Sequence, residues 1–339
     1  NGCYLRQTGW GQILSDMVPM GIHANSWLAN ALACLDDGQD IVLVTVTATK
    51  GSSPRDHGSQ MLVTMTGIWQ TIGGGALEFD VMARARKMLA SDDDDWQRQH
   101  MTVILGPDMG QCCGGQMSLL LEKFTAKQAG ALAALAQEDH HDHMLAHPLE
   151  SGVPLTLQSV QSSFDDVVFM APAMPRQTPL FIYGAGHVSR ALIPRLDGLG
   201  FDIFLVDIEA ARFADDLGDN VQKLLAKTPE KIALRAPQGA VHLVMTHSHS
   251  LDEAVCLQLL MRGDFAYLGL IGSKSKRARF AKRLAAAGVS PAMLDQLICP
   301  IGISEINGKS PAHVALSIAA DLAIWQQLRD DAKQRANEA

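Results

Sequence analysis

Several features that define specialised protein classes are scarce in this chain of 339 residues. Lys and Arg together number 28 against 36 Asp and Glu, so the formal net charge is -8 and there is no basic excess to meet a phosphate backbone. We therefore expect no nucleic-acid partner, and any anion must bind in a local pocket. No apolar run approaches the roughly 20 residues that a membrane-spanning helix needs, so we expect no membrane association.

Cysteine is also too sparse for a disulfide scaffold. The six cysteines lie at irregular intervals in a chain far longer than a disulfide-rich mini-protein. This usage is typical of a reducing compartment, and we expect a cytoplasmic protein with free thiols. The first residues lack the basic-then-apolar order of a signal peptide. We expect residues 1–25 to be an extension outside the folded domains.

What the sequence does contain is two patterns in succession. Length and the 47% of hydrophobic residues predict two separate cores. Residues 26–150 combine helical periodicity with β-branched runs, and one pair of runs is joined by Thr66-Gly67 as in a hairpin. This first part is therefore predicted to be a mixed α+β domain.

The second pattern begins near residue 178. Residues 151–177 contain one or two candidate strands and a stretch rich in Pro and Ala, which predicts a segment connecting two domains. From 178 to 330, successive strands each lead into a helix, which predicts a Rossmann-like, doubly wound parallel sheet. The fold class is thus expected to be α/β, with a mixed α+β domain before the Rossmann-like one.

The first strand of the second domain ends in a glycine turn, Gly184-Ala185-Gly186-His187-Val188-Ser189. In a dinucleotide site, such glycines let the backbone approach a phosphate, and an acid about 20 residues later, here Asp207, bonds a ribose hydroxyl. The third glycine of that motif is replaced by Ser189. Two interpretations stay open: a nucleotide or NAD(P) site that uses Gly184, Gly186, His187 and Asp207, or a turn that serves packing alone.

Polar side chains follow two further strands of this domain. His247 and His249 can bind a metal or act in acid–base chemistry, while the serines beside them can cap a helix. Ser273 and Lys274 begin a helix whose first turns also carry Lys276 and Arg277, which indicates an anion site or a solvated basic face. The carboxyl ends of parallel strands share one edge of a sheet, so these loops are expected where such sheets bind ligands.

Three glycine-rich loops recur in the first domain. They are 49–59 with Lys50 and Arg55, 71–80 with Gly73, Gly74, Gly75 and Glu78, and 106–116 with Cys112 and Cys113. Each loop is a weak motif by itself, because glycine also marks ordinary turns. Together they predict backbone arranged to approach a large polar ligand.

The adjacent cysteines are not suited to a structural bridge. Their side chains diverge in extended backbone, so a Cys112–Cys113 disulfide would need a strained ring. A thiolate favoured by loop N–H groups or by Arg55 is a nucleophile and a ligand for soft metals. We expect a thiol or metal-contact site here, with two small buried cysteines as the alternative. The histidine-rich segment 138–147 is expected to be a solvated helix end, with metal binding as the alternative.

With both halves assembled, the chain resembles the XdhC/CoxI family, the accessory proteins of xanthine dehydrogenase and related molybdenum hydroxylases. The matching segments lie in the family's order over about residues 26–124 and 178–325. They are TKGSSPRDHGSQMLVT, TIGGGALEFDVMARAR, LGPDMGQCCGG, IYGAGHVSRAL, VMTHSHSLD, YLGLIGSKSKRARF, and CPIGI with GKSPAHVALSIAADLA. The departures are Ser189, where glycine is more usual, and the N-terminal extension.

The resemblance implies a chaperone that binds the molybdenum cofactor, holds it while a cysteine desulfurase makes its sulfurated form, and delivers it to apo xanthine dehydrogenase. Such a protein need catalyse no net reaction. Cys112 or Cys113 would then be a thiolate near molybdenum or a persulfide acceptor, and Lys50, Arg55 and the glycine loops would hold the pterin or its phosphate. An NAD(P)-dependent oxidoreductase that uses the 184–189 turn is the alternative. A homodimer is compatible with presenting a cofactor to a partner, although no repeat or stripe indicates one.

Overall fold

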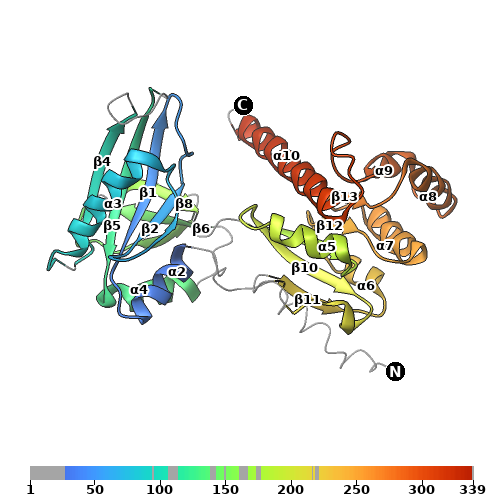
Figure 1. The fold of residues 1–339 in the computed structure, drawn as a ribbon, viewed down its shortest axis with the longest axis horizontal. Helices are drawn as coiled ribbons and strands as arrows, with labels where there is room; N and C mark the ends of the chain where they lie inside the picture. The colour runs from blue at the N-terminus through green and yellow to red at the C-terminus, as the bar shows by residue number, and fades with distance from the viewer. Residues whose placement is uncertain are drawn as a thin grey trace. The chain divides into compact units, whose positions relative to one another are not determined.

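The computed structural model describes residues 27–93, 95–105, 114–137, 143–148, 150–159, 167–172, 177–215, 217 and 221–337. The chain divides into two compact units, one ending at Arg176 and one beginning at Gln177 (Figure 1). Within the described residues, none of the helices is both long enough and apolar enough to cross a membrane.

The first unit is built on an antiparallel five-stranded sheet in the order β3-β2-β1-β5-β4. Its strands are β1 (Ile41–Lys50), β2 (Gln60–Val63), β3 (Ile68–Gln70), β4 (Arg98–Ile104) and β5 (Gln116–Phe124). Helix α3 (Gly75–Leu89) packs on one face, and α2 (Trp27–Asp36) and α4 (Ala126–Gln137) pack on the other. In β1, Val42 and Val44 point toward α3 while Ile41 and Leu43 point the other way, as the two-residue period of a strand requires.

A second, three-stranded sheet completes this unit. It has the order β7-β6-β8 and consists of β6 (His143–Pro148), β7 (Thr156–Ser159) and β8 (Val167–Pro172). The strands β7 and β8 come from the segment that we expected to connect the domains. The expectation of a solvated helix end was wrong for the part from His143 onward, which is strand β6, with His147 fully buried.

A buried carboxylate explains why this histidine lies inside. Glu122 on β5 lies 2.5 Å from His147 Nδ1 and 2.8 Å from Arg98 Nε on β4. Burial alone would raise the pKa of Glu122, but His147 and Arg98 hold it below its ordinary value. The three side chains are distant in sequence, so the local pattern around His147 did not indicate its partner.

The second unit contains a six-stranded parallel sheet in the order β11-β10-β9-β12-β13-β14. Its strands are β9 (Thr178–Tyr183), β10 (Phe201–Asp207), β11 (Val221–Leu225), β12 (Val241–Val244), β13 (Tyr267–Leu270) and β14 (Leu297–Ile298). Its helices are α5 (His187–Leu192), α6 (Pro229–Ala233), α7 (His249–Arg262), α8 (Lys274–Ala286), α9 (Pro291–Asp295) and α10 (Pro311–Asn337). The predicted Rossmann-like fold class is confirmed. The strand order changes direction between β9 and β12, the place where such sheets bind ligands.

A histidine is buried within this sheet. His242 on β12 is 1% exposed, its Nδ1 lies 3.2 Å from the Tyr183 hydroxyl, and its ring stacks on Phe181. Burial, with a smaller contribution from the nearby charge of Arg262, lowers the pKa of His242 to about 3. His242 is therefore neutral in the folded protein at ordinary pH.

This burial predicts a pH dependence of stability. Below about pH 6.5 the unfolded chain binds a proton on His242 that the folded chain does not, so stability falls as the pH decreases toward 3. The parent should lose about 2.7 kcal/mol in free energy of unfolding between about pH 7.5 and about pH 4.5, and His242→Phe should not show this loss. Urea unfolding followed by circular dichroism measures the loss. His100→Phe, at an exposed position on β4, should lose as much as the parent, and an equal loss in the parent and His242→Phe would contradict the assignment.

Candidate functional site

The glycine-rich loops of the first unit leave its five-stranded sheet at the same end. Lys50, the last residue of β1, pairs with Gln116, the first residue of β5. At the same end, Gln60 begins β2, and Gln70 ends β3 opposite Met61. The segments 51–59, 71–74 and 114–115 are therefore neighbours in space. Strand register alone brings together three loops that are far apart in sequence.

These loops touch where a side chain would not fit. A Cβ at Gly115 would collide with the Ser52 carbonyl oxygen, and a Cβ at Gly73 would lie 2.5 Å from Pro54 Cγ. Ser52 also forms an isolated β-bridge with Gly114. Gly73 has a φ of 125°, which only glycine adopts readily. The first loop thus packs directly on the backbone of the other two.

Glu78 supports the second loop from the first turn of α3. Its carboxylate accepts hydrogen bonds from Ile72 N at 2.9 Å and from the Thr71 hydroxyl. Burial raises the pKa of Glu78, but the Thr71 hydroxyl and the N–H groups of Ile72, Gly73 and Gly74 outweigh burial and lower it. The ionised carboxylate therefore fixes the loop to the helix.

The same end of the sheet offers cations and uncovered backbone. Lys50 and Arg55 are exposed. Gly74 and Gly114 both have positive φ, and among the described residues no atom outside their chain neighbours lies within 4 Å of where their Cβ would be. Cys112 and Cys113 lie outside the described residues. Within the described part of the chain, no group of three or more His, Cys, Asp or Glu side chains is placed to hold a metal ion.

In the second unit, the glycine turn after β9 is packed against the loop after β12. Gly184 has a φ of 110°, and a Cβ there would lie 2.5 Å from the Met245 carbonyl oxygen. Ser189 is buried and its hydroxyl donates to the Gly184 carbonyl. Serine at the third glycine position therefore stabilises the turn. Next to it, Gly186 faces open space and His187 is exposed.

The carboxylate of Asp207 accepts hydrogen bonds from backbone N–H groups. One carboxylate oxygen accepts from Ala185 N at 2.7 Å, and the other accepts from Ile208 N at 2.7 Å and Glu209 N at 3.2 Å. The side chain is 4% exposed. The acid that a dinucleotide site would offer to a ribose thus holds the glycine turn onto β10.

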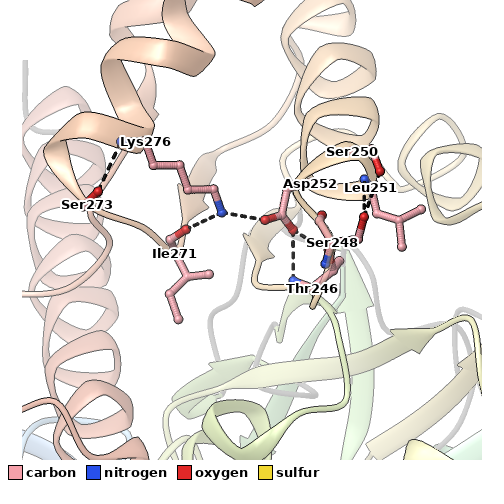
Figure 2. A network of polar contacts seen from close by, with 8 residues as sticks. All are labelled: Thr246, Ser248, Ser250, Leu251, Asp252, Ile271, Ser273 and Lys276. Atoms are coloured by element: carbon pink, nitrogen blue, oxygen red, sulfur yellow. Dashed lines mark hydrogen bonds and ion pairs between the residues drawn. The ribbon is translucent and has the colours of Figure 1, made fainter.

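The loops after β12 and β13 are joined by a buried ion pair, shown in Figure 2. Asp252 on α7 accepts from Thr246 N at 3.0 Å and from the Thr246 hydroxyl at 2.7 Å. Its other oxygen lies 2.6 Å from Lys276 Nζ on α8, and Lys276 also donates to the Ile271 carbonyl at 2.9 Å. Figure 2 shows both serine caps beside this pair, Ser248 at the start of α7 and Ser273 at the start of α8.

The ion pair changes the interpretation of the basic residues in the first turns of α8. Lys276 and Arg277 were expected to face an anion or solvent, and this was wrong for Lys276, which is buried. Lys276 binds Asp252, and Arg277 donates to the carbonyls of Leu294 and Leu297. The local sequence did not indicate the pair because Asp252 and Lys276 lie on different helices, 24 residues apart. Lys274, His247 and His249 are exposed at this edge.

Comparison with known proteins places each unit in one family. A model described as the XdhC and CoxI family matches residues 34–98, and a model described as the XdhC Rossmann domain matches residues 180–322. One match lies in each unit, in the expected order. The chain belongs to the XdhC and CoxI family.

Individual relatives of this XdhC-family protein are distant. It is 26% identical over 285 residues to an uncharacterized protein, YqeB, of Escherichia coli (strain K12), and the match covers 83% of this chain and 42% of that protein. The chain therefore spans less than half the length of that relative. It is 23% identical over 334 residues to a Bacillus subtilis (strain 168) protein named as a probable xanthine dehydrogenase subunit, and the match covers 86% of this chain and 94% of that protein.

A solved structure shares the fold. It is described as a xanthine dehydrogenase from Bacillus halodurans and has a TM-score of 0.70 and 22% sequence identity. The likeness covers 88% of this chain and 95% of that chain. At this identity it supports the architecture of the XdhC-family chain and carries no further conclusion.

The role of Glu78 can be tested against its neighbour Asp80, whose carboxylate pairs with Arg84 on the exposed face of α3. Glu78→Ala should lower the free energy of unfolding by about 1 to 2 kcal/mol, because it leaves the loop N–H groups without their acceptor. Asp80→Ala should cost less than about 0.5 kcal/mol. Hydrogen–deuterium exchange should become faster at residues 71–75 in Glu78→Ala only. Equal exchange in the parent and both variants would show that Glu78 does not hold the loop.

The buried ion pair predicts a larger effect. Lys276→Met leaves Asp252 buried without its charged partner and should lower the free energy of unfolding by about 3 to 5 kcal/mol. Lys274→Met, two residues earlier and exposed, should change it by less than about 0.5 kcal/mol. Calorimetric unfolding of the parent and the two variants measures both changes in the free energy of unfolding. Similar losses in the two variants would be inconsistent with a stabilising role specific to Lys276.

Proposed function

We propose that this protein is an accessory protein of a xanthine dehydrogenase or a related molybdenum hydroxylase. It binds the molybdenum cofactor, holds it while a cysteine desulfurase provides its sulfur ligand, and delivers it to the apo-enzyme. The observation that carries the proposal is the meeting of three glycine loops in the unit that matches the XdhC and CoxI model. The B. subtilis relative, which the chain matches over most of its length and whose name refers to xanthine dehydrogenase, supports the choice of client.

The described residues fit this cargo. The molybdenum cofactor has a phosphate, a pterin with polar edges, and a metal bound by sulfur. The exposed cations Lys50 and Arg55 would pair with the phosphate. The backbone at Gly74 and Gly114, where the other described residues leave the Cβ position open, would admit the pterin edges.

The proposed sulfur chemistry rests on Cys112 and Cys113. They directly precede Gly114 in the sequence, and Gly114 bridges to Ser52 in the first loop. A thiolate is the form that binds a soft metal or accepts sulfur from a desulfurase persulfide. We assign this role to the cysteine pair without choosing between the two residues.

The nucleotide hypothesis is weaker. His187, His247 and His249 are exposed at the carboxyl edge of the parallel sheet, and the space beside Gly186 is open. However, Asp207 directs its carboxylate to three backbone N–H groups, so a ribose would have to compete with them. We therefore place the accessory function ahead of an NAD(P)-dependent oxidoreductase.

Binding is tested by mixing the purified protein with molybdenum cofactor under anaerobic conditions and separating by size. We expect molybdenum and pterin to comigrate with the protein. The double variant Lys50→Ala/Arg55→Ala should bind about tenfold or more weakly, because two charge-assisted contacts are lost. Lys87→Ala, exposed in the last turn of α3 and so away from the loops, is the matched control and should bind like the parent. Absence of comigration would contradict the proposed function.

Delivery is tested by reconstituting apo xanthine dehydrogenase from the loaded protein. We expect the parent to restore activity and the double variant Cys112→Ala/Cys113→Ala to deliver cofactor that lacks the sulfur ligand or to retain it poorly. If that variant binds and transfers sulfurated cofactor as well as the parent, the role of the cysteines is wrong. Tight NADH binding with turnover of a carbonyl substrate would favour the oxidoreductase instead.

A further inference from the structure

Phe79 stands out among the apolar side chains on the surface. It is 74% exposed, more than any other large hydrophobic residue in the described part of the chain. Helix α3 directs Leu77, Val81 and Ala85 into the core, so Phe79 lies on the opposite, outward face. A single exposed apolar residue is common on protein surfaces and needs no explanation by itself. The position of this one is what suggests a role.

Helix geometry directs the side chain of Phe79 toward the second glycine loop. A helical side chain leans toward the N-terminus of its helix and covers the turn before its own Cα. For Phe79 that turn contains Gly75 and Ala76, which are exposed and have little or no side chain. Just beyond lies Gly74, and among the described residues no atom outside its chain neighbours lies within 4 Å of where its Cβ would be. The lean of the side chain would therefore bring the aromatic ring toward the open side of Gly74.

Glu78, the residue before Phe79, fixes the first turns of α3 relative to that loop. Its carboxylate accepts hydrogen bonds from Ile72 N and from the Thr71 hydroxyl. The backbone of Phe79 is fixed with these turns. The loop in turn packs on Pro54 of the first loop through Gly73. A ligand held between these loops would therefore meet the start of α3 in a fixed position, and the exposed Phe79 side chain is free to turn toward that ligand.

We propose that Phe79 stacks on the flat ring system of the ligand that the glycine loops hold, a pterin if the proposed function is correct. This inference rests on the proposed function and adds a specificity contact to it. Phosphate contacts by Lys50 and Arg55 do not distinguish one phosphorylated ligand from another, whereas stacking selects for a planar heterocycle. Phe79 would thus select the pterin, while the cations contribute affinity for its phosphate.

The test compares four variants in the full chain, with molybdenum cofactor as the probe under anaerobic conditions. Phe79→Ala and Phe79→Leu remove the aromatic face, Phe79→Trp keeps it, and Met65→Ala is the control. Met65 is 57% exposed in the turn between β2 and β3, at the other end of β2 from the glycine loops. Because Phe79 is exposed, all variants should unfold at the same temperature as the parent, and calorimetry checks this.

Removal of the ring should weaken cofactor binding about tenfold in Phe79→Ala, the loss typical of one stacking contact. Phe79→Leu should be similarly weak, while Phe79→Trp should bind like the parent and gain a tryptophan fluorescence signal that the pterin quenches. Met65→Ala should bind like the parent. The quenching is a readout that a purely structural effect would not produce.

The outcomes separate this inference from the function on which it rests. If the parent does not bind the cofactor, the proposed function fails and the stacking contact fails with it. If the parent binds but Phe79→Ala binds equally well, only the stacking contact is overturned. If Phe79→Ala binds the cofactor normally but delivers less of it to apo-dehydrogenase, the ring contacts the client protein. That result also overturns the stacking contact.

Discussion

The glycine-loop end of the first unit depends on one close approach of backbone to backbone. Gly115 lies against the carbonyl oxygen of Ser52, where any Cβ would collide. At Gly73 the ring of Pro54 packs on the glycine backbone, so the first loop contacts both of the others. Among the described residues at this end, Gly51, Gly75 and Gly114 are exposed, with Lys50 and Arg55 beside them. Exposed glycine backbone next to cations suits a ligand that is large, polar and anionic.

The two units use their polar groups differently. At the carboxyl edge of the parallel sheet, polar groups predicted to meet a ligand are occupied by the protein itself: Asp207 binds backbone, and Lys276 binds Asp252. These contacts stabilise the turns and join α7 to α8. In the first unit, the buried polar side chains Glu122 and His147 lie between the sheets, while the cations near the loops stay exposed. In the Rossmann-like unit, the acid that a ribose would need is thus bound to backbone, while His187, His247 and His249 stay exposed. We therefore prefer the first unit as the candidate for cargo binding.

Sequence reasoning predicted the parts of the structure that depend on local pattern. The alternation of strands and helices predicted the parallel sheet, and the hairpin signal at Thr66-Gly67 corresponds to the turn between β2 and β3. Contacts between distant residues were missed. His147 belonged to a polar segment, and only the buried Glu122 on β5 explains its position. Lys276 was one of several basic residues in a helix start, and nothing local distinguished the one that meets Asp252. Phe79 was overlooked because an apolar residue in a helix is expected to be buried.

The central claim is that the glycine-loop end of the first unit holds the cargo. Hydrogen–deuterium exchange of the full chain, with and without molybdenum cofactor, tests it most directly, because it locates the ligand without altering any residue. The account predicts slower exchange at residues 51–59, 71–75 and 114–115 when the cofactor is present. Unchanged exchange there, together with slower exchange at 184–189 and 246–249 in the second unit, would contradict it.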